Sequence, residues 1–244
     1  HPEKTLCLRQ QSAGRFDRAI TIMMTSVPFK PVEKQELDFL RVYLITDRKR
    51  IGKDRFLNAV EGALEGGVRA LQIREKDLNP NDLLALALEV KSITGRYHAK
   101  LFINDRADIA VMAGADGVHL TETSVQTGEV KNNFPGLIVG VSTHSIEGAR
   151  LAETQGADFI TFSPIYATPS KANYGPPQGL DLLRQVTQAV HLPVLALGGI
   201  TPHRVPECLE HGAFGVAVIS GIWDSTHIKQ QSSEYTQNFG GNTL

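Results

Sequence analysis

Polar and cationic side chains follow short apolar runs of this chain, where strands of a parallel sheet would end. The segment QIREK holds Gln72, Arg74 and Lys76 two residues apart, so strand alternation sends all three to one face. A planar guanidinium and a compact ammonium beside an amide suit an anionic ligand or a polarised heterocycle. The alternative is a solvated loop in which Glu75 forms a salt bridge.

Two later runs end in residues that could bind metal or move protons. FINDRAD places Asn104 and Asp105 directly after an apolar run, where Asp105 either caps the following helix or binds a metal or substrate. GVSTHS places Ser142 and His144 at another strand end, and histidine is the side chain best matched to proton transfer near neutral pH. A purely structural hydrogen bond is the alternative for His144, and Ser145 could be a helix N-cap.

The last three apolar runs lead into turns suited to phosphate. ATPSK combines the hydroxyls of Thr168 and Ser170 with Lys171, a weak signal when taken singly. The GGI segment that contains Gly199 removes side chains where a backbone N–H could approach a ligand, and Ser220 opens a helix whose N-terminus favours an anion. Because loops after the last strands of an α/β barrel often bind phosphate, the set predicts a small phosphorylated ligand.

The elements that must position these residues alternate between short β-branched runs and amphipathic stretches, the pattern of repeated βα units. Eight strands are predicted, at 42–45, 70–73, 101–103, 117–120, 137–141, 159–162, 194–197 and 215–219. Helical spacing of apolar residues is evident over 82–94, 146–155 and 180–190. We therefore predict a single (β/α)8 TIM barrel over 39–225, with a partly ordered N-terminal extension over 1–38 and a flexible tail over 226–244.

Composition excludes several classes of function. The 244 residues carry a formal net charge of −1 without a basic block, so nucleic acid and anionic membranes are not expected partners. No apolar run reaches the roughly 20 residues of a membrane-spanning helix. Cys7 and Cys208 lie far apart with no second cysteine or histidine cluster nearby, which favours neither disulfides nor zinc and agrees with a cytoplasmic location.

Taken together, QIREK, NDRAD, GVHL, GVSTH, SPIYATPSK, LGGIT and ISGI resemble the thiamine phosphate synthase and TenI superfamily over about residues 41–225. By this resemblance, a thiazole phosphate is held by Thr168, Ser170, Gly199, Ile219 and Ser220. The pyrimidine diphosphate of a synthase would meet Gln72, Arg74, Lys76, Asn104 and Lys171, with Asp105 as one ligand of Mg²⁺.

The chain departs from the synthase pattern after the fourth strand. Synthases continue H-(I/L)-G-Q-x-D, whose final Asp is the second Mg²⁺ ligand, but here Ser124 occupies that position. A neutral hydroxyl is a poor replacement because Mg²⁺ prefers charged oxygen donors. Glu122, two positions earlier, stays open as a substitute.

TenI-like thiazole tautomerases share this departure, need no metal, and use a histidine that matches His144. The resemblance thus favours a metal-independent tautomerase that aromatises a carboxythiazole phosphate, with His144, Lys171 and Arg74 as catalytic residues and Ser142 in the binding set. Two alternatives stay open. One is a synthase that uses Mg²⁺, and the other is a regulatory barrel that binds a phosphorylated ligand without turnover. The expected partner is a phosphorylated thiazole, and a homo-oligomer is left open.

Overall fold

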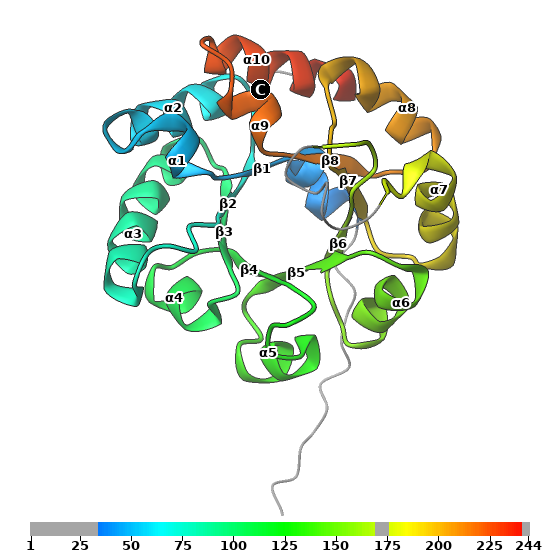
Figure 1. The fold of residues 1–244 in the computed structure, drawn as a ribbon. Coiled ribbons are helices and arrows are strands. Elements are labelled where there is room, and N and C mark those ends of the chain that lie inside the picture. The colour runs from blue at the N-terminus through cyan, green and yellow to red at the C-terminus, as the bar shows by residue number, and fades with distance from the viewer. Residues whose placement is uncertain (1–33, 169–175, 241–244) are drawn as a thin grey trace, which may run out of the picture. The chain divides into compact units, whose positions relative to one another are not determined.

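The computed structural model describes residues 34–168 and 176–240, in which eight parallel strands close into a TIM barrel (Figure 1). Neighbours in sequence are neighbours in the barrel, and β1 pairs with β8 to complete the ring, with Val42 opposite Val216. The strands are β1 (Val42–Ile45), β2 (Ala70–Ile73), β3 (Lys100–Asn104), β4 (Gly117–Leu120), β5 (Ile138–Thr143), β6 (Phe159–Phe162), β7 (Val194–Leu197) and β8 (Gly215–Val218).

Helices form an outer ring around the strands (Figure 1). They are α1 (Arg48–Ile51), α2 (Phe56–Glu65), α3 (Pro80–Arg96), α4 (Ala107–Met112), α5 (Thr127–Asn133), α6 (Ile146–Thr154), α7 (Gly179–Ala189), α8 (Val205–Glu210), α9 (Ser220–Trp223) and α10 (Ile228–Thr236), with short 3₁₀ segments η1 (Lys34–Arg41), η2 (Lys53–Arg55), η4 (Pro202–Arg204) and η5 (Gln237–Phe239). In the part of the chain that the structure describes, none of these helices combines the length and hydrophobicity that crossing a bilayer requires.

The strands are short and apolar because both of their faces are buried. One face packs on the outer helices, and the other fills the barrel with a cluster that includes Tyr43, Phe102 and Phe159. These three rings meet edge to face, with centroids 5.4 to 5.5 Å apart, the arrangement that aromatic quadrupoles favour. Leu37 and Leu40 of η1 join this cluster. The amino-terminal part of the barrel is therefore packed solid.

The sequence-based boundaries agree closely with the structure. Five of the eight predicted strands have the observed bounds, while β3 and β5 extend by one or two residues and β8 ends one residue earlier. The side chain of Ser145 caps α6 as expected, since its Oγ accepts a hydrogen bond from the Gly148 N–H at 3.0 Å. Asn79 caps α3 in the same way, accepting from Asp82.

The C-terminal segment differs from its prediction. We expected a flexible tail over 226–244, but α10 packs on the barrel wall against α2 and α9. Tyr235 is fully buried and its hydroxyl donates to the Ile200 carbonyl at 2.8 Å, while the Thr236 hydroxyl donates to the Gly66 carbonyl at 3.0 Å. We missed this helix because its sequence is rich in Gln and Ser, and the residues that it packs against belong to the barrel. Most of the predicted N-terminal extension lies outside the described residues.

Candidate functional site

A cavity of about 660 Å³ opens at the carboxyl ends of the strands. It is lined by residues at the ends of all eight strands or in the loops that follow them, so residues far apart in sequence gather at one rim. Eight of the predicted site residues line it: Gln72, Arg74, Lys76, Asn104, Ser142, His144, Ile219 and Ser220. Thr168 and Gly199 are described but do not line the cavity, and Ser170 and Lys171 lie outside the described residues.

Arg74 and Lys76 are two cations on the wall of the cavity. Among the described residues, neither Arg74 nor Lys76 forms an ion pair. The alternative reading, a salt bridge between a QIREK cation and Glu75, is therefore not found among the described residues, and Glu75 pairs with Arg48 instead. A pair of uncompensated positive charges at a concave surface attracts a polyanion, because a low-dielectric wall concentrates their field.

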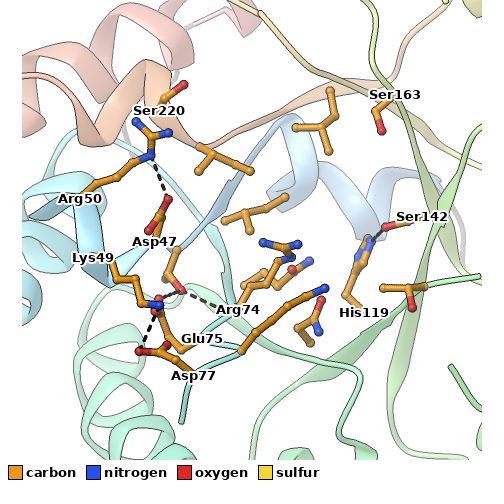
Figure 2. A pocket seen from close by; sticks show the side chains of 18 of the residues that line it. Asp47, Lys49, Arg50, Arg74, Glu75, Asp77, His119, Ser142, Ser163 and Ser220 are labelled. Atoms are coloured by element: carbon orange, nitrogen blue, oxygen red, sulfur yellow. Dashed lines mark hydrogen bonds and ion pairs between the residues drawn. The ribbon is translucent and has the colours of Figure 1, made fainter. Parts of the chain in front are cut away.

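The neighbouring cations are compensated. Lys49 lies 3.6 Å from the Asp77 carboxylate, and Arg50 binds Asp47 at 2.9 Å and Asp224 at 3.0 Å. Figure 2 shows the Lys49–Asp77 and Arg50–Asp47 pairs on the same side of the cavity. These pairs hold the loop after β1 between the loop after β2 and the end of α9.

Glu75 also lines the cavity, and its buried carboxylate is bound to the loop after β1. Its carboxylate accepts from the Thr46 hydroxyl at 2.6 Å and from the Arg48 N–H at 3.0 and 3.2 Å. The Thr46 hydroxyl oxygen also accepts from the Arg74 N–H at 3.0 Å. Burial raises the pKa of Glu75, and these hydrogen bonds only partly oppose the effect. Glu75 therefore fixes the two loops that present the cavity's cations.

A buried hydrogen-bond relay crosses the floor of the cavity. The Gln72 amide donates to the Tyr43 hydroxyl at 3.0 Å, and this hydroxyl lies 3.3 Å from His119 Nδ1. His119 Nε2 lies 3.1 Å from Ser142 Oγ, a contact that Figure 2 shows. Burial, followed by the charge of Arg74, lowers the pKa of His119 to about 3, so the ring is neutral. Gly140 makes room for that ring, since a Cβ there would lie 2.6 Å from His119 Nδ1.

His119 and the loop after β1 are functional-site residues that were not predicted from the sequence. In β4, the residues on either side of His119, Val118 and Leu120, pack against the outer helices. Because side chains alternate along a strand, the His119 ring could have been predicted to lie inside the barrel. Thr46, Asp47, Lys49 and Arg50 come directly after β1, where the rule applied to the other strands would have found them. Strand alternation would therefore have identified His119, and the strand-end rule would have identified the loop after β1.

His144 is anchored at the rim of the cavity. Its Nδ1 lies 2.7 Å from the Ser163 carbonyl oxygen, an arrangement in which Nδ1–H donates and Nε2 keeps its lone pair. Since His144 also lines the cavity, this nitrogen is suited to accept a proton from a ligand. The contact is itself a structural hydrogen bond, so the two roles that the sequence left open are compatible.

Asp105 does not cap α4 and does not line the cavity, and its role as a metal or substrate ligand stays a prediction. Its backbone is left-handed, with φ of 64°, its side chain is exposed, and it does not line the cavity. Arg106 holds the N-cap position of α4, without a side-chain hydrogen bond, so the capping prediction for Asp105 was wrong.

The position of the second magnesium ligand in the synthase pattern offers no carboxylate. Ser124 Oγ accepts from the Thr121 N–H at 2.8 Å and lies 3.0 Å from the Thr121 hydroxyl, so it closes a local turn. Glu122 is exposed and lines the cavity, but no group of three or more His, Cys, Asp or Glu side chains within residues 34–168 and 176–240 is arranged to hold a metal ion.

The double glycine after β7 serves packing. Gly199 has φ of 65°, and a Cβ there would lie 2.9 Å from the Ala167 carbonyl oxygen and from Tyr166 Cβ. Glycine is thus required by the neighbouring loop after β6, and the close approach of a ligand to its backbone stays a prediction. This loop leads directly into the residues that the structure does not describe.

Comparison with known proteins places this geometry in a family. A family model described as thiamine monophosphate synthase matches residues 42–222. A Geobacter sulfurreducens protein named "Putative thiamine-phosphate synthase" is 52% identical over 77% of this chain and 88% of its own length. A Methanoculleus marisnigri thiamine-phosphate synthase is 40% identical over 74% of this chain and 86% of its own. The solved thiamine phosphate pyrophosphorylase of Pyrococcus furiosus is 32% identical, covers 82% of this chain and 95% of its own, and superposes with a TM-score of 0.76.

Proposed function

Because the chain belongs to the thiamine monophosphate synthase family, we propose that it couples hydroxymethylpyrimidine diphosphate with a thiazole phosphate to form thiamine phosphate. The observation that carries this proposal is the pair of uncompensated cations, Arg74 and Lys76, beside Gln72 and Asn104 in one cavity. The names of the similar proteins support the same reaction. This ranking reverses our expectation from the sequence, which favoured a tautomerase.

The size and polarity of the cavity support a two-substrate reaction. Pockets for small ligands span about 300–1,000 Å³, and a volume near 660 Å³ has room for two heterocycles with their anionic groups. Ile219 and Ser220 lie where α9 begins, and the first N–H groups of a helix lack partners within the helix. They would receive the thiazole phosphate, while Arg74 and Lys76 would receive the diphosphate.

In the proposed reaction, the C–O bond between the pyrimidine methylene carbon and the diphosphate breaks, and a C–N bond forms from that carbon to the thiazole nitrogen. Diphosphate leaves with the electron pair of the broken bond. Arg74 and Lys76 would stabilise the charge that develops on it, since preformed charges contribute most where water is excluded. Glu75 holds the loop from which both cations project. We assign no step to a magnesium ion, because Ser124 offers no carboxylate at the position of the second ligand.

A thiazole tautomerase is the second candidate, and two observations favour it, one at His144 and one at Ser124. His144 Nδ1 is tied to the Ser163 carbonyl, which leaves Nε2 for proton transfer, and Ser124 replaces a carboxylate that only the synthase needs. In this reading the ring would lose a proton to His144 and gain one elsewhere as it becomes aromatic, and no metal would take part.

Two assays on the full chain separate the candidates. The first mixes both substrates, with and without Mg²⁺, and measures diphosphate release. The second follows thiazole absorbance after addition of the dihydro tautomer of the carboxythiazole phosphate. Release of diphosphate in step with thiamine phosphate supports the synthase, whereas turnover in the second assay alone overturns it in favour of the tautomerase. Binding of either phosphate without turnover would support the regulatory barrel.

Two variants sharpen the assignment. His144→Asn should abolish tautomerisation but leave phosphate binding intact, and unchanged turnover would remove His144 from the proton-transfer role. Ser124→Asp restores the carboxylate of the synthase pattern. If the missing carboxylate limits coupling, this variant should release diphosphate faster than the wild type and only with Mg²⁺. Ser92→Asp adds the same charge to the exposed surface of α3, outside the cavity lining, and serves as its control.

A further inference from the structure

The relay from Gln72 to Ser142 contains one buried polar atom without a partner. Gln72 is 1% exposed, and its Oε1 has no hydrogen-bond partner among the described residues, although its Nε2 donates to Tyr43. A buried acceptor left unsatisfied costs about 1–3 kcal/mol. Gln72 lines the cavity, so a ligand there could supply the missing donor.

The charges around Gln72 set the direction of its amide. Arg74 lies on the same face of β2 and also lines the cavity, as does Lys76. An amide oxygen turned toward two cations is favoured, whereas an NH₂ group in the same place would be repelled. The nitrogen must then face Tyr43, as the 3.0 Å contact has it.

The orientation of the Gln72 amide determines which atom donates in each later hydrogen bond of the relay. The Tyr43 oxygen accepts from Gln72, so its own hydrogen is free to donate to His119 Nδ1 at 3.3 Å. A neutral imidazole that accepts at Nδ1 carries its proton on Nε2, which then donates to Ser142 Oγ at 3.1 Å. The Thr161 hydroxyl also points at Ser142 Oγ, at 3.5 Å. The Ser142 hydroxyl therefore accepts within the relay and can donate its own hydrogen to a ligand in the cavity.

We infer that Tyr43 and His119 are positioning residues that fix the hydrogen-bond polarity of the cavity floor, with an acceptor at Gln72 and a donor at Ser142. Neither side chain needs to touch a substrate for this role. The inference deepens the proposed function and rests on it for the identity of the ligand, which would be a heterocycle that presents an N–H to Gln72. A ring with a carbonyl at that point would meet the Gln72 oxygen and be rejected.

The tautomer of His119 tests the relay without any substrate. Nitrogen-15 NMR of the labelled full chain at pH 7 distinguishes a neutral imidazole protonated at Nε2 from one protonated at Nδ1. We expect the proton on Nε2, and the expected pattern should change in Tyr43→Phe, which removes the donor to Nδ1. A proton on Nδ1 in the wild type reverses every bond of the relay and overturns the inference, whatever reaction the protein performs.

Ligand discrimination tests the consequence. The probes are two pyrimidine diphosphates that differ by an amino group or a carbonyl at one ring position, with affinities measured by calorimetry. The wild type should prefer the amino compound by about 10-fold or more, which corresponds to one unsatisfied buried group. Tyr43→Phe frees the Gln72 amide to rotate and should bring the ratio of the two affinities close to 1.

Tyr235→Phe is the matched control, because it removes a hydroxyl from an equally buried tyrosine that is outside the relay. It should leave the ratio of the two affinities unchanged. A folded Tyr43→Phe protein that keeps the wild-type ratio overturns the inference. If Tyr43→Phe fails to fold, or if neither diphosphate binds the wild type, the proposed coupling function is tested separately and the NMR result still decides the relay.

Discussion

Replacing Glu75 should separate two effects on the free energy of unfolding, the stabilisation by its hydrogen bonds and the destabilisation by its buried charge. Glu75→Ala leaves the Thr46 hydroxyl and the Arg48 N–H, both buried, without their acceptor. Each orphaned donor costs about 1–3 kcal/mol, but burial of the carboxylate already offsets part of that sum. We expect a loss of about 3 kcal/mol in the free energy of unfolding, or roughly 6–12 °C in Tm for a domain of this size.

Glu75→Gln is the matched variant because it keeps the shape and one acceptor oxygen while removing the charge. Its cost at pH 7 should be about 1 kcal/mol or less. Urea denaturation of both variants and the wild type, followed by circular dichroism, measures the three free energies of unfolding.

The pH dependence gives the sharper test. Because burial raises the pKa of Glu75 above its ordinary value of 4.5, the folded state favours the protonated form. The contribution of Glu75 is then fully present below the unfolded pKa and is lost as pH rises through the folded value. Since glutamine does not titrate, the wild type should lose stability relative to Glu75→Gln from about pH 4.5 toward pH 7. A wild type that gains stability over this interval would refute the reasoning.

Three further predictions test other parts of the structure. Arg74→Ala should weaken calorimetric binding of inorganic diphosphate by about tenfold at low salt and less at high salt, while Arg106→Ala, which is outside the cavity lining, should not. Removing residues 227–244 should lower the free energy of unfolding in urea by at least about 2 kcal/mol, because α10 buries a tyrosine, and a flexible tail would cost nothing. Burial raises the pKa of Cys208 to about 11, so mass-mapped alkylation at pH 8 should be roughly 100-fold slower than in urea, and equal rates would contradict its burial.

The sequence predicted the barrel well because local signals and the final structure agree in most elements. Both faces of each strand are buried, so the strands appear as short apolar runs, and helix caps such as Ser145 lie at their expected places. The C-terminal helix was missed for the opposite reason. Its own sequence is polar, and the contacts of Tyr235 and Thr236 that hold it are made by distant parts of the chain.

The candidate site was only partly accessible from the sequence. Residues at the strand ends were found because every parallel strand ends at the same rim, and eight of them line one cavity. Which partner each side chain takes was not accessible. QIREK alone cannot tell whether Glu75 neutralises Arg74 or turns to Thr46, since the answer depends on a loop 29 residues earlier.

By itself, the sequence determined the fold class, the rim at which the site lies and the family to which its motifs belong, because periodicity and strand-end chemistry are local properties. The tertiary structure alone decided that Arg74 and Lys76 have no carboxylate partner among the described residues, that Ser124 closes a turn, and that His119 is buried in a relay. The hydrogen-bond partners and the burial of these side chains depend on residues from different strands, which come into contact only when the barrel closes. No local sequence pattern predicts those contacts.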